Sequence, residues 1–188
     1  MEANQNSKLE NEMAIVVQAK TDDQAFSFLY EYYFPKIYYF ILKRVGHKEA
    51  AEDLVSGVFL KVFGKLKSFK VEHEMSFKAW IYRIATNSLT DYYRRQSRKS
   101  EVDLDSLTEL ADVKDAGEEA AGADDAKLVR TCLADLPPRD REILELKFFA
   151  ELSNLEIAET RKISANNAGV LIYRALKKFK ENYQKYAK

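Results

Sequence analysis

The sequence has few of the residues that break helices, form disulfides or bind metals. Three prolines and six glycines in 188 residues favour long helices over a turn-rich β protein. The single cysteine, Cys132, excludes an intramolecular disulfide, and with only two histidines it leaves no metal-ligand cluster. No apolar run approaches the roughly 18–20 residues that cross a membrane, and residues 1–12 are polar, unlike a signal peptide. We therefore expect a soluble, cytoplasmic protein without membrane insertion, metal or cofactor.

Charge is segregated along the chain, although the net charge is zero. Between Glu101 and Asp125 lie ten acidic residues and one basic residue, Lys114, so the rest of the chain carries 29 basic against 20 acidic residues. This segregation suggests two basic domains joined by a flexible acidic linker at residues 98–125, which could form a transient helix around 104–110. A solvated acidic loop without a partner would show the same pattern.

Helical periodicity fills the chain before this linker. A capping-box pattern at Thr21–Gln24 opens a helix that is kinked or restarted at Pro35 and stops at Gly46. Two more helices are expected at about 48–66 and 76–95. With residues 1–12 as a disordered leader, these helices form a first domain at 13–97.

The residues after the linker have the layout of a helix-turn-helix. Two helices on either side of Pro137-Pro138 come first. Ser153–Glu156 is then a capping box that opens a short helix, Lys162–Ser164 forms a turn, and a longer basic helix follows. Its N-terminus favours a phosphate. An ordinary helical hairpin would show the same spacing.

The longer helix has an inner and an outer side. Its buried seam is predicted to consist of Ala168, Ile172, Ala175 and Phe179. The outward faces then carry Asn166, Asn167, Val170, Tyr173, Arg174, Lys177 and Lys178. Since no strand-like alternation appears, the expected fold is all-α, with an N-terminal helical bundle and a C-terminal helix-turn-helix domain at 126–188.

The third helix mixes aromatic with basic residues. Trp80, Tyr82, Tyr92 and Tyr93 stand among Lys78, Arg83, Arg94, Arg95, Arg98 and Lys99. Basic side chains attract a phosphate backbone and aromatic rings stack on unpaired bases, so the mixture suits single-stranded or opened DNA. The rings could equally belong to the core, because Trp80 and Ile84 share a helical face.

Three segments, in this order, resemble the sigma-70 family of RNA polymerase sigma factors, in particular its extracytoplasmic-function (ECF) type. AEDLVSGVFLKVFGKLKSF resembles the helix that grips the clamp helices of the polymerase's largest subunit. SFKAWIYRIATNSLTDYYRR resembles the segment that melts and reads the −10 promoter element. LADLPPRDREILELKFFAELSNLEIAETRKISANNAGVLIYRALKKF resembles the domain that binds the −35 element. Each motif alone is modest, but the ordered set is specific.

The resemblance implies a role for residues of each segment. It places Asp53, Leu54, Ser56, Phe59 and Phe63 on the polymerase. It places Trp80, Arg83, Asn87, Arg94 and Arg95 along the −10 DNA. It places Ser164, Asn166, Asn167, Tyr173, Arg174, Lys177 and Lys178 on the −35 duplex. The loop at 67–76 would form part of a pocket for a flipped-out base, whose extrusion costs a few kcal/mol.

The resemblance also implies partners, namely core RNA polymerase and promoter DNA. Many members of the family are held inactive by an anti-sigma factor, and this chain could be too, although no residue identifies such a partner. A sigma factor is not an enzyme, since it lends promoter recognition and strand opening to the polymerase. The two domains are expected to be separately stable and mobile about the linker.

The sequence departs from the family pattern at two places. Ser56 stands where many members have glutamine, and Gly57, where an acidic residue is common, costs a helix about 1 kcal/mol against alanine. Ala168 to Leu171 replace the usual polar and basic residues of the recognition helix. Direct readout would then fall to Asn166 and Asn167, and asparagine's favoured partner is adenine. We expect −35 recognition that relies on DNA shape and few base contacts.

The main alternatives to a sigma factor are a transcriptional regulator and a helical enzyme. A helix-turn-helix transcriptional regulator with an N-terminal ligand-binding or dimerisation domain would need a pocket or a self-complementary helix pair there. A helical enzyme would need paired carboxylates in an apolar setting, a Cys/His group or a glycine-rich phosphate loop. The sequence offers none of these three.

Overall fold

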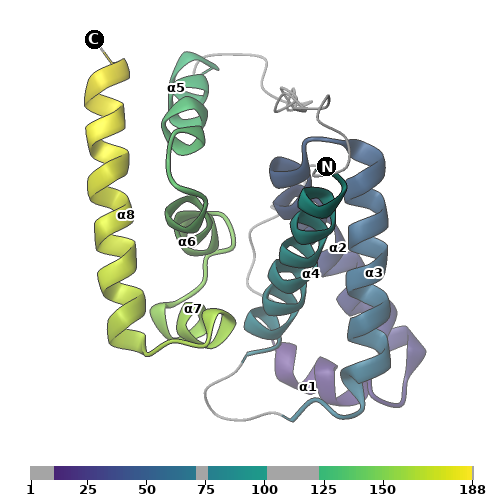
Figure 1. Ribbon diagram of the computed structural model, residues 1–188. Coiled ribbons are helices and arrows are strands. Elements are labelled where there is room, and N and C mark those ends of the chain that lie inside the picture. Colours follow the sequence, from purple (N-terminus) through teal and green to yellow (C-terminus); the bar gives the residue numbers. More distant parts are fainter. Residues whose placement is uncertain (1–10, 71–75, 101–122, 188) are drawn as a thin grey trace.

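A computed structural model of the chain describes residues 11–70, 76–100 and 123–187. Within these residues the protein consists of eight helices and has no strand, which confirms the predicted all-α fold (Figure 1). The helices are α1 (Glu12–Gln18), α2 (Asp23–Val45), α3 (Lys48–Leu66), α4 (Phe77–Ser100), α5 (Ala123–Ala134), α6 (Pro138–Phe148), α7 (Asn154–Arg161) and α8 (Ala165–Tyr186). Helices α1–α4 form one unit and α5–α8 a second unit beside it (Figure 1).

The first unit begins with a helix that the periodicity analysis missed. Helix α1 contains Glu12, which was assigned to the disordered leader, and the Tyr33 hydroxyl donates a hydrogen bond to the Glu12 carboxylate. Val16 of α1 is fully buried in the same core. Residues 1–10 of the predicted leader lie outside the described part of the chain.

Helix α2 starts and stops largely as its sequence dictates. Its N-cap is Asp22 rather than Thr21, and the Asp22 carboxylate accepts a hydrogen bond of 2.8 Å from the Gln24 amide. The helix then continues through Pro35 instead of restarting there. It ends at Gly46, whose φ of 72° lies in the left-handed region that glycine adopts without strain.

The core of the first unit is aliphatic and aromatic, and α2, α3 and α4 all contribute to it. Its largest fully buried side chains include Leu29, Ile37, Ile41, Val55, Val58, Leu66, Phe77 and Ile81. Aromatic pairs join the helices edge to face, such as Phe40 of α2 with Tyr82 of α4, whose ring centroids lie 5.0 Å apart.

The second unit follows the predicted helix-turn-helix layout. Pro138 occupies the first turn of α6. Ser153 and Glu156 form both hydrogen bonds of the capping box that opens α7. The predicted seam of α8 is confirmed, since Ala168, Ile172 and Ala175 are buried and Phe179 is half-buried.

Two helices extend further toward the acidic linker than predicted. Helix α4 reaches Ser100, past its expected end at 95, and α5 begins at Ala123 rather than at 126. Residues 98–100 of α4 and 123–125 of α5 therefore lie within the range that was assigned to the linker. The transient helix expected at 104–110 lies outside the described residues, as does most of the polar loop before α4.

The two units are in contact with each other, which differs from the expectation of domains that move freely about a linker. Helix α7 packs against the start of α4, where the Thr160 hydroxyl donates to the Ala79 carbonyl oxygen at 3.3 Å. Nearby, the Ser76 hydroxyl donates to the Glu156 carboxylate at 2.5 Å, and the Lys78 ammonium donates to a backbone carbonyl at 3.2 Å. These polar groups lie on the facing surfaces of the two units.

Candidate functional site

The outer face of α3 exposes a stripe that combines charge and apolar surface. Asp53, Ser56, Leu60 and Phe63 follow one another at steps of three or four residues and so share this face. Leu60 is 73% exposed and Phe63 is 55% exposed. Large exposed apolar side chains grouped on one face indicate a protein-binding surface. Sequence reasoning missed Leu60, although its spacing from Ser56 and Phe63 was a signal for it.

Two of the residues predicted to touch the polymerase lie beneath this stripe. Phe59 is only 6% exposed, and its ring packs edge-on against Tyr30 at a centroid distance of 4.7 Å. Leu54 is half-buried against the core. Phe59 therefore supports the stripe from inside, and direct contact falls to its exposed neighbours.

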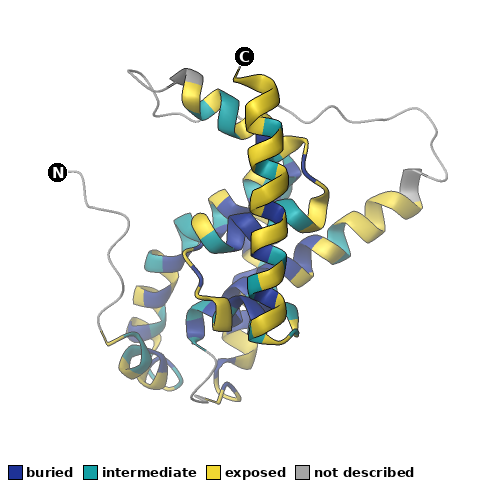
Figure 2. Cartoon of the chain, turned by 90° about the vertical axis from the view of Figure 1, so that its left-hand side faces the viewer, coloured by how far each residue is buried: buried dark blue, intermediate teal, exposed yellow. Residues whose placement is uncertain are grey.

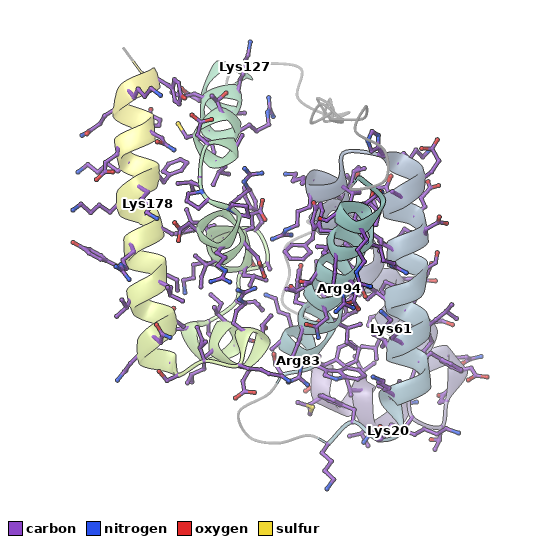
Figure 3. All side chains as sticks on the ribbon, viewed as in Figure 1. Lys20, Lys61, Arg83, Arg94, Lys127 and Lys178 are labelled. Carbon is purple, nitrogen blue, oxygen red and sulfur yellow. The ribbon has the colours of Figure 1, made fainter. Side chains whose placement is uncertain are left out.

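Helix α4 carries a polar and basic face. Arg83, Asn87, Thr90 and Arg94 recur at steps of four and three residues and share this face, with Arg95 next to it. All are exposed except Arg83, which is half-buried. Figure 3 labels Arg83 and Arg94 along the helix, with Lys61 of α3 nearby, whose ammonium donates to the Ser88 hydroxyl of α4 at 2.8 Å.

The charges of this face are largely open to solvent. Arg94 forms an ion pair of 3.0 Å with Asp91, in which the two side chains are 66% and 50% exposed. Such an exposed pair contributes about 0–1 kcal/mol, so it leaves Arg94 available to a stronger anionic partner. The predicted −10 residues Asn87, Arg94 and Arg95 are therefore brought together on accessible surface.

Trp80, which was predicted to lie along the −10 DNA, belongs to the core instead. It is 6% exposed, and its ring lies 4.5 Å from that of Phe69 and 5.6 Å from that of Phe77. Tyr82 is also buried, and burial raises the pKa of its phenol above the usual value. Tyr93 is the more accessible ring at 44% exposure, and its hydroxyl donates to the Arg44 carbonyl oxygen at 2.5 Å.

Helix α8 presents its outer face along its whole length, visible as the exposed band in Figure 2. The predicted residues Asn166, Asn167, Tyr173, Arg174, Lys177 and Lys178 are all exposed. Lys178 also pairs with Asp140 of α6. Ser164 has a structural role, because its hydroxyl oxygen accepts a hydrogen bond of 3.2 Å from the Asn167 amide and caps the helix.

A buried ion pair joins the two units near their centre. Arg44 of α2 pairs with Glu145 of α6, and each side chain is only 10% exposed. Burial raises the pKa of the Glu145 carboxyl and lowers the pKa of the Arg44 guanidinium, although the attraction between the two charges opposes both shifts. Both shifts have the same main cause, which is that burial removes the water that would stabilise each charge.

The same junction contains a cavity of about 290 Å³. Its lining includes the ion pair together with Lys36, Tyr39, Phe40, Lys43, Tyr82 and Phe149. Lys43 lies over the Phe149 ring, with its ammonium 4.8 Å from the ring centroid. The cavity is built from both units, so it exists only while they are docked.

No group of three or more His, Cys, Asp or Glu side chains in residues 11–70, 76–100 and 123–187 could hold a metal ion. Over the same ranges, no helix has the length and apolar composition that a membrane span needs.

Two family models match the chain in the order of these surfaces. Residues 29–99 match Sigma-70 region 2, which contains the α3 and α4 faces, and residues 126–179 match Sigma-70 region 4, which contains α7 and most of α8. Two solved structures of similar fold are CnrH in complex with the cytosolic domain of CnrY, and the Bartonella quintana sigma factor RpoE in complex with the anti-sigma factor NepR. The CnrH structure has 21% identity, covers 93% of this chain and 98% of its own, and has a TM-score of 0.66. The RpoE structure has 20% identity, covers 85% and 96%, and has a TM-score of 0.72.

Sequence relatives point to the same family. A probable RNA polymerase sigma factor of Haemophilus influenzae is 31% identical over 70% of this chain and 76% of its own length. The ECF sigma factor SigM of Bacillus subtilis is 27% identical over 84% and 94%. The ECF sigma factor BldN of Streptomyces coelicolor is 30% identical over 88% of this chain, which spans 63% of that relative. These comparisons do not favour the regulator interpretation. The chain belongs to the sigma-70 family of RNA polymerase sigma factors, and within it to the extracytoplasmic-function type.

Proposed function

We propose that this alternative sigma factor, which binds core RNA polymerase and directs promoter-specific transcription initiation, divides that work among three helices. Helix α3 binds the polymerase, α4 follows the −10 strand, and α8 binds the −35 duplex. The observation that carries the proposal is the α3 stripe. There the apolar side chains of Leu60 and Phe63 remain more than half exposed after the described residues have packed. The domain limits are proposed as 13–97 for region 2, 98–125 for the linker and 126–188 for region 4.

The α3 stripe suits a helical partner such as the clamp helices of the largest polymerase subunit. Leu60 and Phe63 would fill the apolar centre of the contact, and Asp53 and Ser56 its polar edge. Phe63 is held from beneath by Phe26, whose ring centroid lies 5.0 Å away. Phe59 and Leu54 position this surface rather than meet the partner.

The α4 face suits an opened DNA strand. Arg83, Arg94 and Arg95 would neutralise phosphates, and Asn87 offers both a donor and an acceptor to a base edge. Trp80 acts from the core, where its ring packs against Phe69, which follows α3 in the chain. Tyr93 is the ring best exposed for stacking on a base.

The α8 face supplies affinity for the −35 duplex through its cations and its N-terminus. Arg174 and Lys177 are exposed about three turns into the helix, where they would meet phosphates. The Ser164 hydroxyl caps only the backbone amide of Asn167, so the amides before it in the first turn can still donate to a phosphate.

The docked arrangement must open when the protein engages a promoter. A compact body of 188 residues has a radius of gyration of about 16 Å, or roughly 40 Å across. The −10 and −35 elements lie about 25 base pairs apart, which is about 85 Å at 3.4 Å per base pair. The docked units cannot reach both elements at once, so the α4–α7 contact and the Arg44–Glu145 pair have to separate.

This protein is proposed to act in the cytoplasm, where the polymerase works, and to contribute no catalytic residue of its own. The solved structure of RpoE with the anti-sigma factor NepR supports the proposal that an anti-sigma factor also controls this chain. No described residue singles out such a partner.

Co-elution with bacterial core RNA polymerase in size-exclusion chromatography tests the proposal. The Leu60→Arg variant is expected to lose co-elution. The matched control is Val17→Arg, the same change at a 54% exposed apolar residue of α1, which is expected to co-elute. Co-elution of Leu60→Arg at wild-type level would refute the assignment of α3. A wild-type chain that binds duplex DNA but not polymerase would favour the regulator interpretation instead.

A further inference from the structure

The first turns of α8 expose apolar surface where charge is usual for a helix that binds DNA. Val170 is 53% exposed and Tyr173 is 71% exposed. Asn166, Val170 and Tyr173 are spaced by four and three residues, so they form one stripe. The stripe lies opposite the seam of Ala168 and Ile172, which is buried against the rest of the unit.

Charge around the stripe indicates that its partner is DNA rather than protein. The amides of Asn166 and Asn167 precede Val170, and the cations Arg174 and Lys177 follow on the exposed side of the same helix. Lysine is depleted at protein–protein interfaces, whereas lysine and arginine together neutralise a phosphate backbone. The exposed apolar residues therefore lie within a DNA-binding face.

The chemistry of base edges limits what such a stripe can recognise. In a helix-turn-helix, residues near the N-terminus of the second helix contact bases in the major groove. Guanine is recognised there mainly by arginine or lysine, and adenine by asparagine or glutamine. The first nine residues of α8 contain neither arginine nor lysine, and Arg174 is the tenth. The apolar group on a base edge in that groove is the C5-methyl of thymine.

We propose that Val170 recognises the C5-methyl group of a thymine in the −35 element, next to adenines bound by Asn166 and Asn167. This inference rests on the proposed function, in which α8 enters the major groove of the −35 duplex. It adds a further base-specific contact to the expected recognition by DNA shape and by Asn166 and Asn167. The preferred −35 element is therefore expected to be rich in A·T pairs and not to depend on a guanine for recognition.

Replacing thymine with deoxyuracil tests this contact, because the exchange removes only the methyl group. Holoenzyme assembled from the full chain and core polymerase first enriches duplexes from a random library at the −35 position. Each thymine of the enriched element is then exchanged singly, and binding is measured by fluorescence anisotropy. One exchange is expected to weaken wild-type binding about fourfold, the factor for burying one carbon group.

Variants at position 170 assign the effect to this side chain. Val170→Ala is expected to abolish the penalty of the uracil exchange, whereas Val170→Thr, which keeps one methyl, retains part of it. Leu176→Ala is the matched control at a 38% exposed residue of the same helix, and it should leave the penalty intact.

Several results would overturn the inference. The first is an enriched element that depends on a guanine. The second is that no exchange of thymine for deoxyuracil weakens binding, and the third is that the exchange still weakens binding of Val170→Ala. Loss of polymerase binding in Val170→Ala, with unchanged DNA binding, would assign the stripe to a protein partner. If no duplex is enriched at all, the proposed −35 role of α8 is wrong as well. If a duplex is enriched but shows no uracil effect, only the Val170 contact is wrong.

Discussion

The ion pair between Arg44 and Glu145 gives the sharpest prediction, because it is buried and joins the two units. Glu145→Gln preserves the shape of the side chain and removes its charge. If the units stayed docked, the Arg44 guanidinium would remain buried without a counter-charge. Breaking a buried pair in this way costs about 3–5 kcal/mol.

Separation of the two units costs less free energy than keeping an unpaired Arg44 buried between them. The three hydrogen bonds donated by Ser76, Lys78 and Thr160 across the junction contribute about 0.5–1.5 kcal/mol each. Their sum is comparable with the free-energy cost of burying Arg44 without a counter-charge. Separation removes that cost, because it returns the Arg44 guanidinium to water. Since 1.4 kcal/mol is a factor of ten, we expect the ratio of docked to open protein to fall about 10²- to 10³-fold.

Small-angle X-ray scattering of the full chain measures this change. Glu145→Gln should raise the radius of gyration above that of the wild type, and hydrogen exchange should rise in α7 and at the start of α4. The exposed pair gives the matched control, since Asp91→Asn removes a charge that lies outside the junction and should alter neither quantity.

A double variant distinguishes an electrostatic cause from simple loss of packing. Replacing both partners of a buried pair by apolar residues is often neutral or stabilising, so Arg44→Leu with Glu145→Leu should restore docking. The reasoning is refuted if Glu145→Gln scatters like the wild type, or if the double variant is as open as the single one.

Three further predictions concern stability. Gly57→Ala should stabilise the first unit by about 1 kcal/mol in thermal unfolding, because an added Cβ meets no atom within 4 Å; destabilisation would reveal an unseen clash. Lys162→Gly should stabilise the second unit by about 1 kcal/mol in urea unfolding, since Lys162 has a φ of 56°, and an unchanged midpoint would contradict this strain. Burial raises the pKa of Glu156, but hydrogen bonds from Ser76 and Ser153 outweigh it and lower the pKa below 4.5. The wild type should therefore be more stable than Glu156→Gln at pH 6, and lose that advantage as the pH falls below 4.5; an equal difference at pH 3 and pH 6 would refute it.

The candidate surfaces were predictable to the extent that they depend on helical spacing. The α8 residues were expected on the outer side of the helix because a seam at steps of three and four residues defines the opposite side. That spacing does not distinguish a ring that stacks on DNA from one that fills the core. Trp80 is in the core because Phe69, eleven residues earlier, folds back against it at 4.5 Å, and no local pattern records that contact.

Local signals in the sequence were sufficient for most of the helices and for several of their ends, because helix caps and stops depend on neighbours within one turn. Ser153 and Glu156 close their capping box, Gly46 stops α2 with a left-handed φ, and α3 spans the predicted range. The order of the three motifs likewise predicted the family, which the family models confirm.

Only the tertiary structure decided which residues are accessible and how the two units meet. Leu60 is exposed and Phe59, its neighbour in the chain, is buried, because α2 covers one side of α3 and leaves the other open. Arg44 and Glu145 pair across about one hundred residues of sequence. Such contacts depend on the packing of whole helices, whose free energy is shared among many distant side chains, so no short stretch of sequence encodes them.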